Sequence, residues 1–400
     1  MILGISIDEN FVYVNVDGTD DVVRYPFAIG RNLSNNNWFI GDDARFENVD
    51  NVDMVIDKLY YLLENDVSAR IGDTTYESKD LARIFISNLL SKYSDIEFVT
   101  IVLRNNNIKI FSKLKNALSQ CINNDKKYKI TTYSEAFIAY IKSKGEEFYN
   151  NPIALFDFTE KALTFYELLR YKTENDIEYW KVDTKEHLAL PLDLLSGDAG
   201  KKVCDNLLCD FSKSCLNEEI YNNIILSGIG FNEASSYRDF MTYVCSITDV
   251  NTDVDFFAKS ATIISKDVVA NVTYPNIINM TDARTTVAIR LLAKVNQTNT
   301  KIELVKPGEE WFNIYNNTFN VIVEDEKTIK FEYLKVIEGV IKEFVVGIPE
   351  KYQVRQDKSN LFEVCMTFLQ QNLLQITVTD KGFGEFYEPT FQQFTRDINL

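Results

Sequence analysis

Few side chains in this sequence have the type and spacing that enzyme chemistry needs. His187 is the only histidine, so a Ser-His-Asp triad or a histidine-ligated zinc site would have to be built on that one residue. Cys204, Cys209 and Cys215 form the only cysteine cluster, and they offer neither a Cys-x2-Cys pair nor a nearby histidine for zinc. We interpret them as small apolar residues on a partly buried helix. Hydrolase and zinc-enzyme functions are therefore disfavoured.

A glycine turn is a second chemical candidate. Gly228-Ile229-Gly230-Phe231 follows the short apolar run 224–226 and precedes a segment with helical spacing. A strand, a glycine turn and a helix in this order can bring the backbone close to an adenosine. The same glycines also suit a tight β-to-α turn that needs them for its backbone alone. The sequence leaves both interpretations open.

The elements that would position these residues follow from hydrophobic spacing. Alternation predicts a β-hairpin around the turn Asp8-Glu9-Asn10 and a second one around Thr159-Glu160-Lys161. The expected hairpin strands are residues 2–7, 11–16, 153–158 and 163–166, and a further buried strand is expected over 98–103. Helical spacing predicts helices over residues 51–65, 79–92, 109–122, 133–144, 190–215 and 234–244.

After residue 267 the pattern changes to short strands with period-two alternation, which is typical of a β-sandwich. The expected strands are 286–293, 301–304, 319–323, 329–333, 362–368 and 374–379. We therefore expect two domains, 1–270 and 280–400, the first of them divided into lobes of about 1–150 and 151–270.

Composition limits the partners. The 400 residues carry a formal net charge of -17, which argues against attraction to nucleic acid or anionic lipid. No apolar run approaches the length of a membrane span, and no charged leader precedes an apolar segment at the amino terminus. Six scattered cysteines suit a reducing compartment. We expect a cytoplasmic protein with a protein or peptide partner, and no partner among nucleic acids or membranes.

Several motifs in order resemble the DnaK-type heat-shock chaperones of the actin and heat-shock ATPase superfamily. They are residues 2–14, Phe39-Ile40-Gly41-Asp42-Asp43-Ala44, residues 132–140, residues 152–159, the glycine turn at 228–231, residues 256–261, Gly347-Ile348-Pro349, residues 362–368 and residues 374–382. The resemblance implies an α/β two-lobed actin-like ATPase-type domain, followed by an all-β sandwich similar to the chaperone substrate-binding β-domain.

The resemblance also implies ATP or ADP with magnesium as cofactor. The positions that match the family's nucleotide site are Ser6, Asp8, Asn10, Thr159, Lys161, Gly228, Gly230 and Phe231. Asp157 matches the carboxylate that holds magnesium through water, and Lys58 falls near the catalytic lysine.

The sequence departs from the family at both phosphate hairpins. Ser6-Ile7-Asp8-Glu9-Asn10 stands where the family has Asp-Leu-Gly-Thr-Thr, and Thr159-Glu160-Lys161-Ala162 replaces its glycine run. Carboxylates at these places oppose a tetraanionic ligand. We expect a chaperone-like interaction module with a degenerate nucleotide site and a weak or absent ATPase. The alternatives are solvated hairpin turns, an active ATP-dependent chaperone with diverged loops, and an actin-like filament subunit.

The expected partner surface lies in the β-domain. The family's peptide-arching loops are apolar, whereas here the corresponding turns are polar, and the chain ends at Leu400, before the position of the family's helical lid. Polar arches favour a folded or basic partner over an extended apolar peptide. The expected partner-binding residues are Asn296, Thr298, Glu324, Asp325 and Glu326.

Overall fold

A computed structural model describes residues 1–45, 53–104, 106–122, 127–174, 176–186, 197–216, 220–314, 316–323, 327–349, 360–385 and 387–400. They form two compact units. Unit 1 contains residues 1–170 and 182–275, and unit 2 contains residues 171–181 and 276–400. His187 lies outside the described residues. The domain boundaries expected from the sequence, 1–270 and 280–400, stay a prediction.

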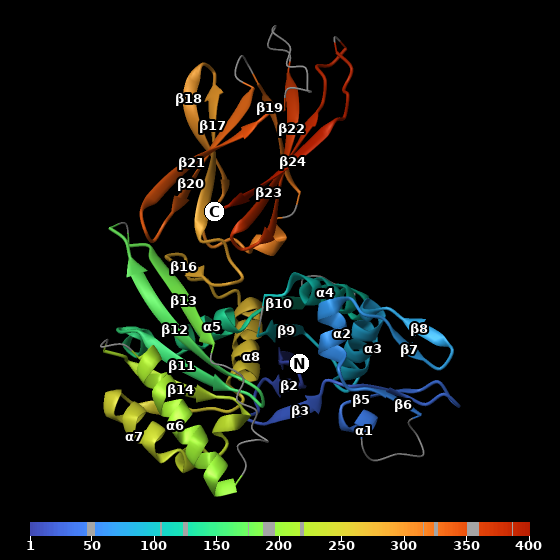
Figure 1. Ribbon diagram of the computed structural model, residues 1–400, viewed down its shortest axis with the longest axis vertical. Coiled ribbons are helices and arrows are strands. Elements are labelled where there is room, and N and C mark those ends of the chain that lie inside the picture. The colour runs from blue at the N-terminus through green and yellow to red at the C-terminus, as the bar shows by residue number, and fades with distance from the viewer. Residues whose placement is uncertain are drawn as a thin grey trace. The chain divides into compact units, whose positions relative to one another are not determined.

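Unit 1 begins with a five-stranded sheet in the order β10-β9-β1-β2-β3 (Figure 1). Its strands are β1 (Ile2–Ile7), β2 (Phe11–Val16), β3 (Val22–Pro26), β9 (Phe98–Leu103) and β10 (Tyr128–Thr132). β1, β9 and β10 run parallel, with Ile7 opposite Leu103 and Leu103 opposite Thr132. Their apolar side chains are almost all buried, as expected for parallel strands covered on both faces.

A second sheet contributes the strands β15, β14, β11 and β12 to this unit, in that order. They are β11 (Ile153–Phe158), β12 (Leu163–Lys172), β14 (Asn223–Ser227) and β15 (Val250–Thr252). α6 and α7 cover one face, where Phe156, Phe211 and Phe240 pack together (Figure 1). The cysteines Cys204, Cys209 and Cys215 belong to this core, which confirms their interpretation as buried apolar residues.

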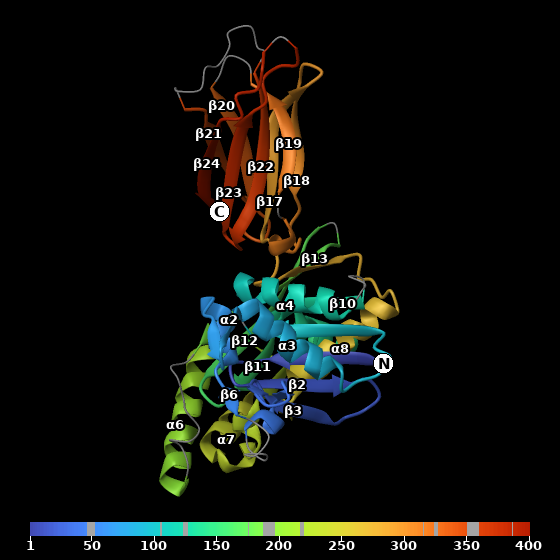
Figure 2. The same cartoon turned by 90° about the vertical axis from the view of Figure 1, so that its right-hand side faces the viewer.

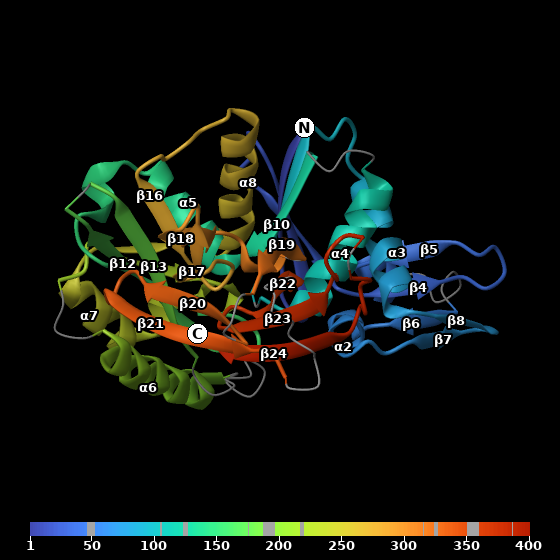
Figure 3. The same ribbon diagram turned by 90° about the horizontal axis from the view of Figure 1, so that it is seen from above.

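The remaining elements of unit 1 are two small sheets and the helices. The small strands are β4 (Ile29–Arg31), β5 (Trp38–Ile40), β6 (Met54–Ile56), β7 (Ala69–Ile71) and β8 (Thr74–Tyr76). The helices are α1 (Asp42–Arg45), α2 (Leu59–Asn65), α3 (Ser78–Leu90), α4 (Ile108–Cys121), α5 (Tyr133–Ser143), α6 (Gly197–Cys215), α7 (Arg238–Ile247) and α8 (Phe256–Val269). α5 and α8 lie side by side (Figure 3), where Tyr140 and Phe256 are in contact.

Unit 2 contains two four-stranded antiparallel sheets whose strands run alongside one another (Figure 2). One has the order β18-β17-β20-β21 and the other β19-β22-β23-β24. The strands are β17 (Val287–Val295), β18 (Thr298–Val305), β19 (Asn317–Ile322), β20 (Thr328–Lys335), β21 (Val340–Gly347), β22 (Leu361–Gln370), β23 (Leu373–Asp380) and β24 (Gln393–Asn399). Side chains that alternate along these strands form one hydrophobic cluster around Trp311 and Phe331. β13 (Glu178–Glu186) pairs in parallel with β16 (Ile277–Met280).

This arrangement shows that the expected fold class is wrong. The described residues do not show a two-lobed actin-like domain followed by a single β-sandwich; they are mixed α/β, with eight α-helices and strands divided among six separate sheets. α8 comes late in unit 1 but packs on β1 and β9 of its first sheet, directly over Gly4. Unit 2 also includes residues 171–181, far from its other strands in sequence. Local periodicity in the sequence carries no information about such long-range packing.

No helix in the described part of the chain is long and apolar enough to cross a membrane.

Candidate functional site

A cluster of buried polar side chains lies at the carboxyl ends of the strands of unit 1. Asp8, Arg104 and Tyr133 directly follow β1, β9 and β10, which are parallel and in register. Asp157 in β11 lies opposite Ser227 at the end of the parallel strand β14. The carboxyl edge of parallel strands is where ligands commonly bind in α/β proteins. We call Asp8, Arg104, Asp157, Thr159 and Thr164 the strand-end cluster.

Arg104 links the end of β9 to the second hairpin. Its Nη1 donates to Thr159 Oγ1 at 3.0 Å and its Nη2 donates to Thr164 Oγ1 at 2.5 Å. Nη2 also lies 3.7 Å from Asp157 Oδ2, with the Arg104 side chain 10% and the Asp157 side chain 3% exposed. Burial lowers the pKa of Arg104, but the charges of Asp157, Tyr166, Tyr133 and Asp8 together outweigh burial, so the net pKa is raised. The guanidinium therefore stays charged and bridges the strand ends.

Asp157 lacks a full set of hydrogen bonds. Its buried Oδ2 has no hydrogen-bond partner among the described residues, and neither has the nearby Ser227 Oγ. Burial raises the pKa of Asp157, while Arg104 lowers it, with burial the stronger of the two. A protonated Asp157 carboxyl group would be able to donate a hydrogen bond, whereas the carboxylate can only accept one.

Asp8 shapes the first hairpin turn. Its Oδ1 accepts hydrogen bonds from the backbone N–H of Asn10 at 2.8 Å and of Phe11 at 2.6 Å. Burial raises the pKa of Asp8 to about 6; the two backbone hydrogen bonds lower it, and Asp157 raises it further. Asp8 therefore has a structural task in the turn and does not point a free carboxylate into solvent.

The hairpin tips also bond to each other. Asn10 Nδ2 donates to Glu160 Oε2 at 3.0 Å, and Lys161 Nζ lies 3.6 Å from Glu9 Oε2. The Lys161–Glu9 pair is exposed, so it contributes at most about 1 kcal/mol. Lys161 thus neutralises a carboxylate of the opposite hairpin.

Tyr13 and Tyr133 are two buried tyrosines near Asp8. Burial raises the pKa of Tyr13 and of Tyr133 above the ordinary value, and the charge of Asp8 adds to the effect at both. Tyr133 is stacked on Phe257 of α8, with ring centroids 3.7 Å apart. Ser6 is buried in β1, one residue before the strand's end. The walls of the cluster are therefore packed side chains.

The glycine turn has a packing role in this structure. A Cβ on Gly228, whose φ is +89°, would lie 2.4 Å from the Phe158 carbonyl oxygen and 2.9 Å from Asp157 Oδ1. A Cβ on Gly230 would lie 2.3 Å from the Phe158 ring. Phe231 is buried against Phe158 and Phe240. Both glycines are needed for this close approach, whether or not a ligand binds nearby.

The other expected residues lie apart from the strand-end cluster. Lys58 is exposed, precedes α2 as its N-cap residue, and has no ion pair within the described part of the chain. Asn296 has a φ of +50° in the two-residue turn between β17 and β18, and Thr298 begins β18; both are exposed. Such turns favour asparagine for its backbone alone. Glu324, Asp325 and Glu326 lie outside the described residues.

Sequence reasoning missed the residue that organises this site. Arg104 is a single cation directly after the apolar strand 98–103, and Thr164 is one polar residue inside a strand. A cation at the end of an otherwise buried strand is the signal that could have identified Arg104, since such a charge needs a partner.

The residues of the cluster do not fit a magnesium–nucleotide complex. Two buried carboxylates flank one guanidinium whose donors are bonded to Thr159 and Thr164, so a polyphosphate would meet net negative charge. The glycine turn is occupied by the Phe158 side chain. Among the described residues, no group of three or more His, Cys, Asp or Glu could hold a metal ion.

Comparison with known families accounts for most of the chain. Residues 11–282 match a family of unknown function, the DUF5716 C-terminal region. Residues 284–400 match a domain of unknown function, DUF8552. No curated protein matches the chain. The family match includes strands of both large sheets of unit 1 and gives the expected actin-like fold class no support.

Proposed function

We propose that this chain, which belongs to the family of unknown function DUF5716, is a protein-interaction module with a degenerate nucleotide site. In this proposal the strand-end cluster holds unit 1 together and does not turn over ATP. Of the properties that the resemblance to heat-shock chaperones implies, the proposal includes only the binding of other proteins.

The bridge made by Arg104 is the observation that carries the proposal. Phosphoryl transfer depends on free donors and cations placed around the phosphates. Here the buried guanidinium donates to Thr159 and Thr164 and faces Asp157, while Lys161 pairs with Glu9. A nucleotide would have to break these interactions and desolvate its own charge beside Asp8 and Asp157. The binding of a partner protein elsewhere on the chain does not require these interactions to break.

Charge and exposed apolar groups support a protein partner. A net charge of -17 favours association with a basic surface and makes that association sensitive to salt. In unit 2, β21 ends its sheet and exposes Val340, Ile341 and Val345. An edge strand with apolar side chains is a common place for a second chain to bind. At one point of this edge, Arg396 Nη1 donates to the Val345 carbonyl oxygen at 2.9 Å.

Capture of partners from an extract of the source cells, with and without Mg-ATP, tests this function. We expect a partner that is held at low salt, lost at high salt and unaffected by Mg-ATP. The matched variant changes Glu324, Asp325 and Glu326 together to serine; it should lose the partner if the acidic sequence steers binding. Release of the captured protein by Mg-ATP, or capture of generic apolar peptides, would instead indicate an ATP-driven chaperone.

A further inference from the structure

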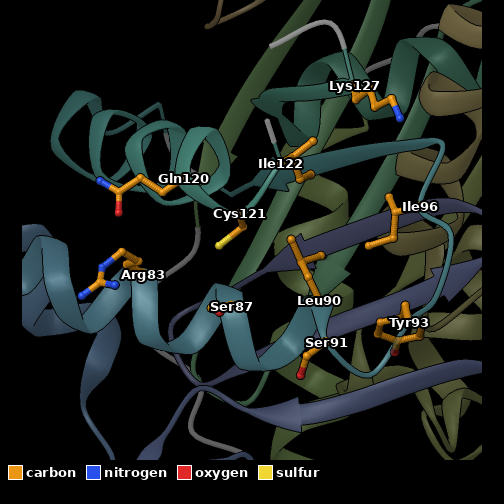
Figure 4. A pocket seen from close by; sticks show the side chains of 10 residues that line it. All are labelled: Arg83, Ser87, Leu90, Ser91, Tyr93, Ile96, Gln120, Cys121, Ile122 and Lys127. Atoms are coloured by element: carbon orange, nitrogen blue, oxygen red, sulfur yellow. The ribbon is translucent and has the colours of Figure 1, made fainter. Parts of the chain in front are cut away.

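A cavity of about 810 Å³ opens between α3 and α4 (Figure 4). It shares no residue with the strand-end cluster, and neither hairpin reaches it. Its volume lies within the range of sites that bind small organic molecules. The side chains around it come from α3, from the end of α4 and from the segments that precede β9 and β10 (Figure 4).

One wall is a single face of α3. Arg83, Ser87, Leu90 and Ser91 recur at helical spacing, so their side chains share one side of the helix. Leu90 is the buried member of this face. The opposite wall includes Cys121, whose thiol points toward α3 (Figure 4).

The cavity has a rigid apolar part. The Tyr93 hydroxyl lies 3.2 Å from that of Tyr25, which fixes the Tyr93 ring at the rim. Leu90, Ile96 and Ile122 add aliphatic surface. An aromatic or branched apolar group would gain free energy by covering these side chains.

The cavity is locally positive on a strongly acidic protein. Arg83 and Lys127 line it, and its described lining contains no carboxylate. Asp80 lies 3.9 Å from Arg83, but both groups are well exposed and the pair is weak. Lys127 has no ion pair or hydrogen bond with any described residue. These two cations are therefore available to an anionic ligand on a chain of net charge -17.

We propose that this cavity binds a compact organic anion, with an apolar ring system against Leu90 and Tyr93 and an acidic group that pairs with Arg83 at one end of the cavity or with Lys127 at the other (Figure 4). Neither the family match nor the proposed protein-binding role assigns a ligand here. A carboxylate, sulfonate or phosphate would serve as the acidic group, because all three accept charge-assisted hydrogen bonds from either cation.

Two fluorescent probes separate the charge from the apolar part. Anilinonaphthalene sulfonate carries the acidic group, and its neutral parent phenylnaphthylamine does not. For the full chain we expect the double variant Arg83→Gln/Lys127→Gln to bind the sulfonate about tenfold more weakly and the neutral probe unchanged. Lys115→Gln, on an exposed position of the same helix α4 that does not line the cavity, should change neither affinity.

Cys121 reports where the probe binds. In a background with Cys245→Ser and Cys365→Ser, the other described cysteines are buried, so a maleimide should label Cys121 alone. We expect the sulfonate probe to slow this labelling at concentrations that match its affinity. Unchanged labelling in the presence of bound probe, or wild-type affinity in the double variant, would overturn the proposal.

Discussion

Gly4→Ala is expected to lower the free energy of unfolding of unit 1 by about 3 kcal/mol or more. A Cβ at this position would lie 2.2 Å from Thr262 N, 2.3 Å from Thr262 Oγ1 and 2.4 Å from the Ala258 carbonyl oxygen. All three atoms belong to α8, which cannot retreat without breaking further bonds. Thr262 Oγ1 donates to Asn15 Oδ1 at 2.7 Å, and Ser265 Oγ donates to the Leu3 carbonyl at 2.8 Å.

Gly18→Ala is the matched control for Gly4→Ala. Gly18 lies in the turn after β2 with a φ of +83° and has no atom within 4 Å of an added Cβ. Only the backbone strain remains, about 1 kcal/mol. Urea unfolding of both variants, followed by circular dichroism, measures the difference. Equal stability of the two variants would show that α8 does not pack on β1 as described.

Arg104→Met is expected to destabilise the chain by about 3–5 kcal/mol near neutral pH, because it leaves the buried Asp157 without its counter-charge. The loss should shrink as the pH falls. Burial raises the pKa of both Asp157 and Asp8, that of Asp8 to about 6, so these groups take up protons in the folded state before they do so unfolded. A protonated carboxyl needs no cation, and stability is therefore regained on acidification.

Two further variants separate the buried bridge from a general effect of charge. Arg104→Met combined with Asp157→Leu removes both charges and should recover most of the lost stability. Arg70→Met breaks the Arg70–Asp73 pair, 3.6 Å apart and fully exposed, and should cost less than about 1 kcal/mol. If Arg104→Met cost no more than Arg70→Met, the bridge would contribute nothing to the fold.

Local patterns predicted the elements that hold the site better than those far from it. The first hairpin has strands at 2–7 and 11–16 and β9 lies at 98–103, as expected from alternation and β-branched content. Residues 54–56 were expected in a helix over 51–65 but form β6, because they pair with β4 from an earlier part of the chain. β21 and β24 were not predicted, since most of their side chains are exposed and lack a clear apolar alternation.

The candidate site could be located from the sequence, but its chemistry could not. Asp8 and Asp157 were identified at the hairpins, and the structure brings both to the strand-end cluster. Arg104 decides what those carboxylates can do, and its distance from Asp157 depends on how β9 is placed against β11 and β12. No spacing along the chain encodes that distance. The role of Gly228 and Gly230 was ambiguous for the same reason. Glycine is needed at both positions because a Cβ there would clash with Phe158, which is distant in sequence.

A calorimetric titration of the wild-type chain with Mg-ATP tests the central claim, that the strand-end cluster is a structural bridge and no longer a phosphate site. We expect no binding tighter than about 1 mM, or about -4 kcal/mol, and no phosphate release. Arg104→Met serves as the comparison, because it removes the bridge yet leaves the carboxylates that repel phosphate, so it should not bind either. A dissociation constant in the low micromolar range, with turnover abolished by Asp157→Ala, would contradict the claim.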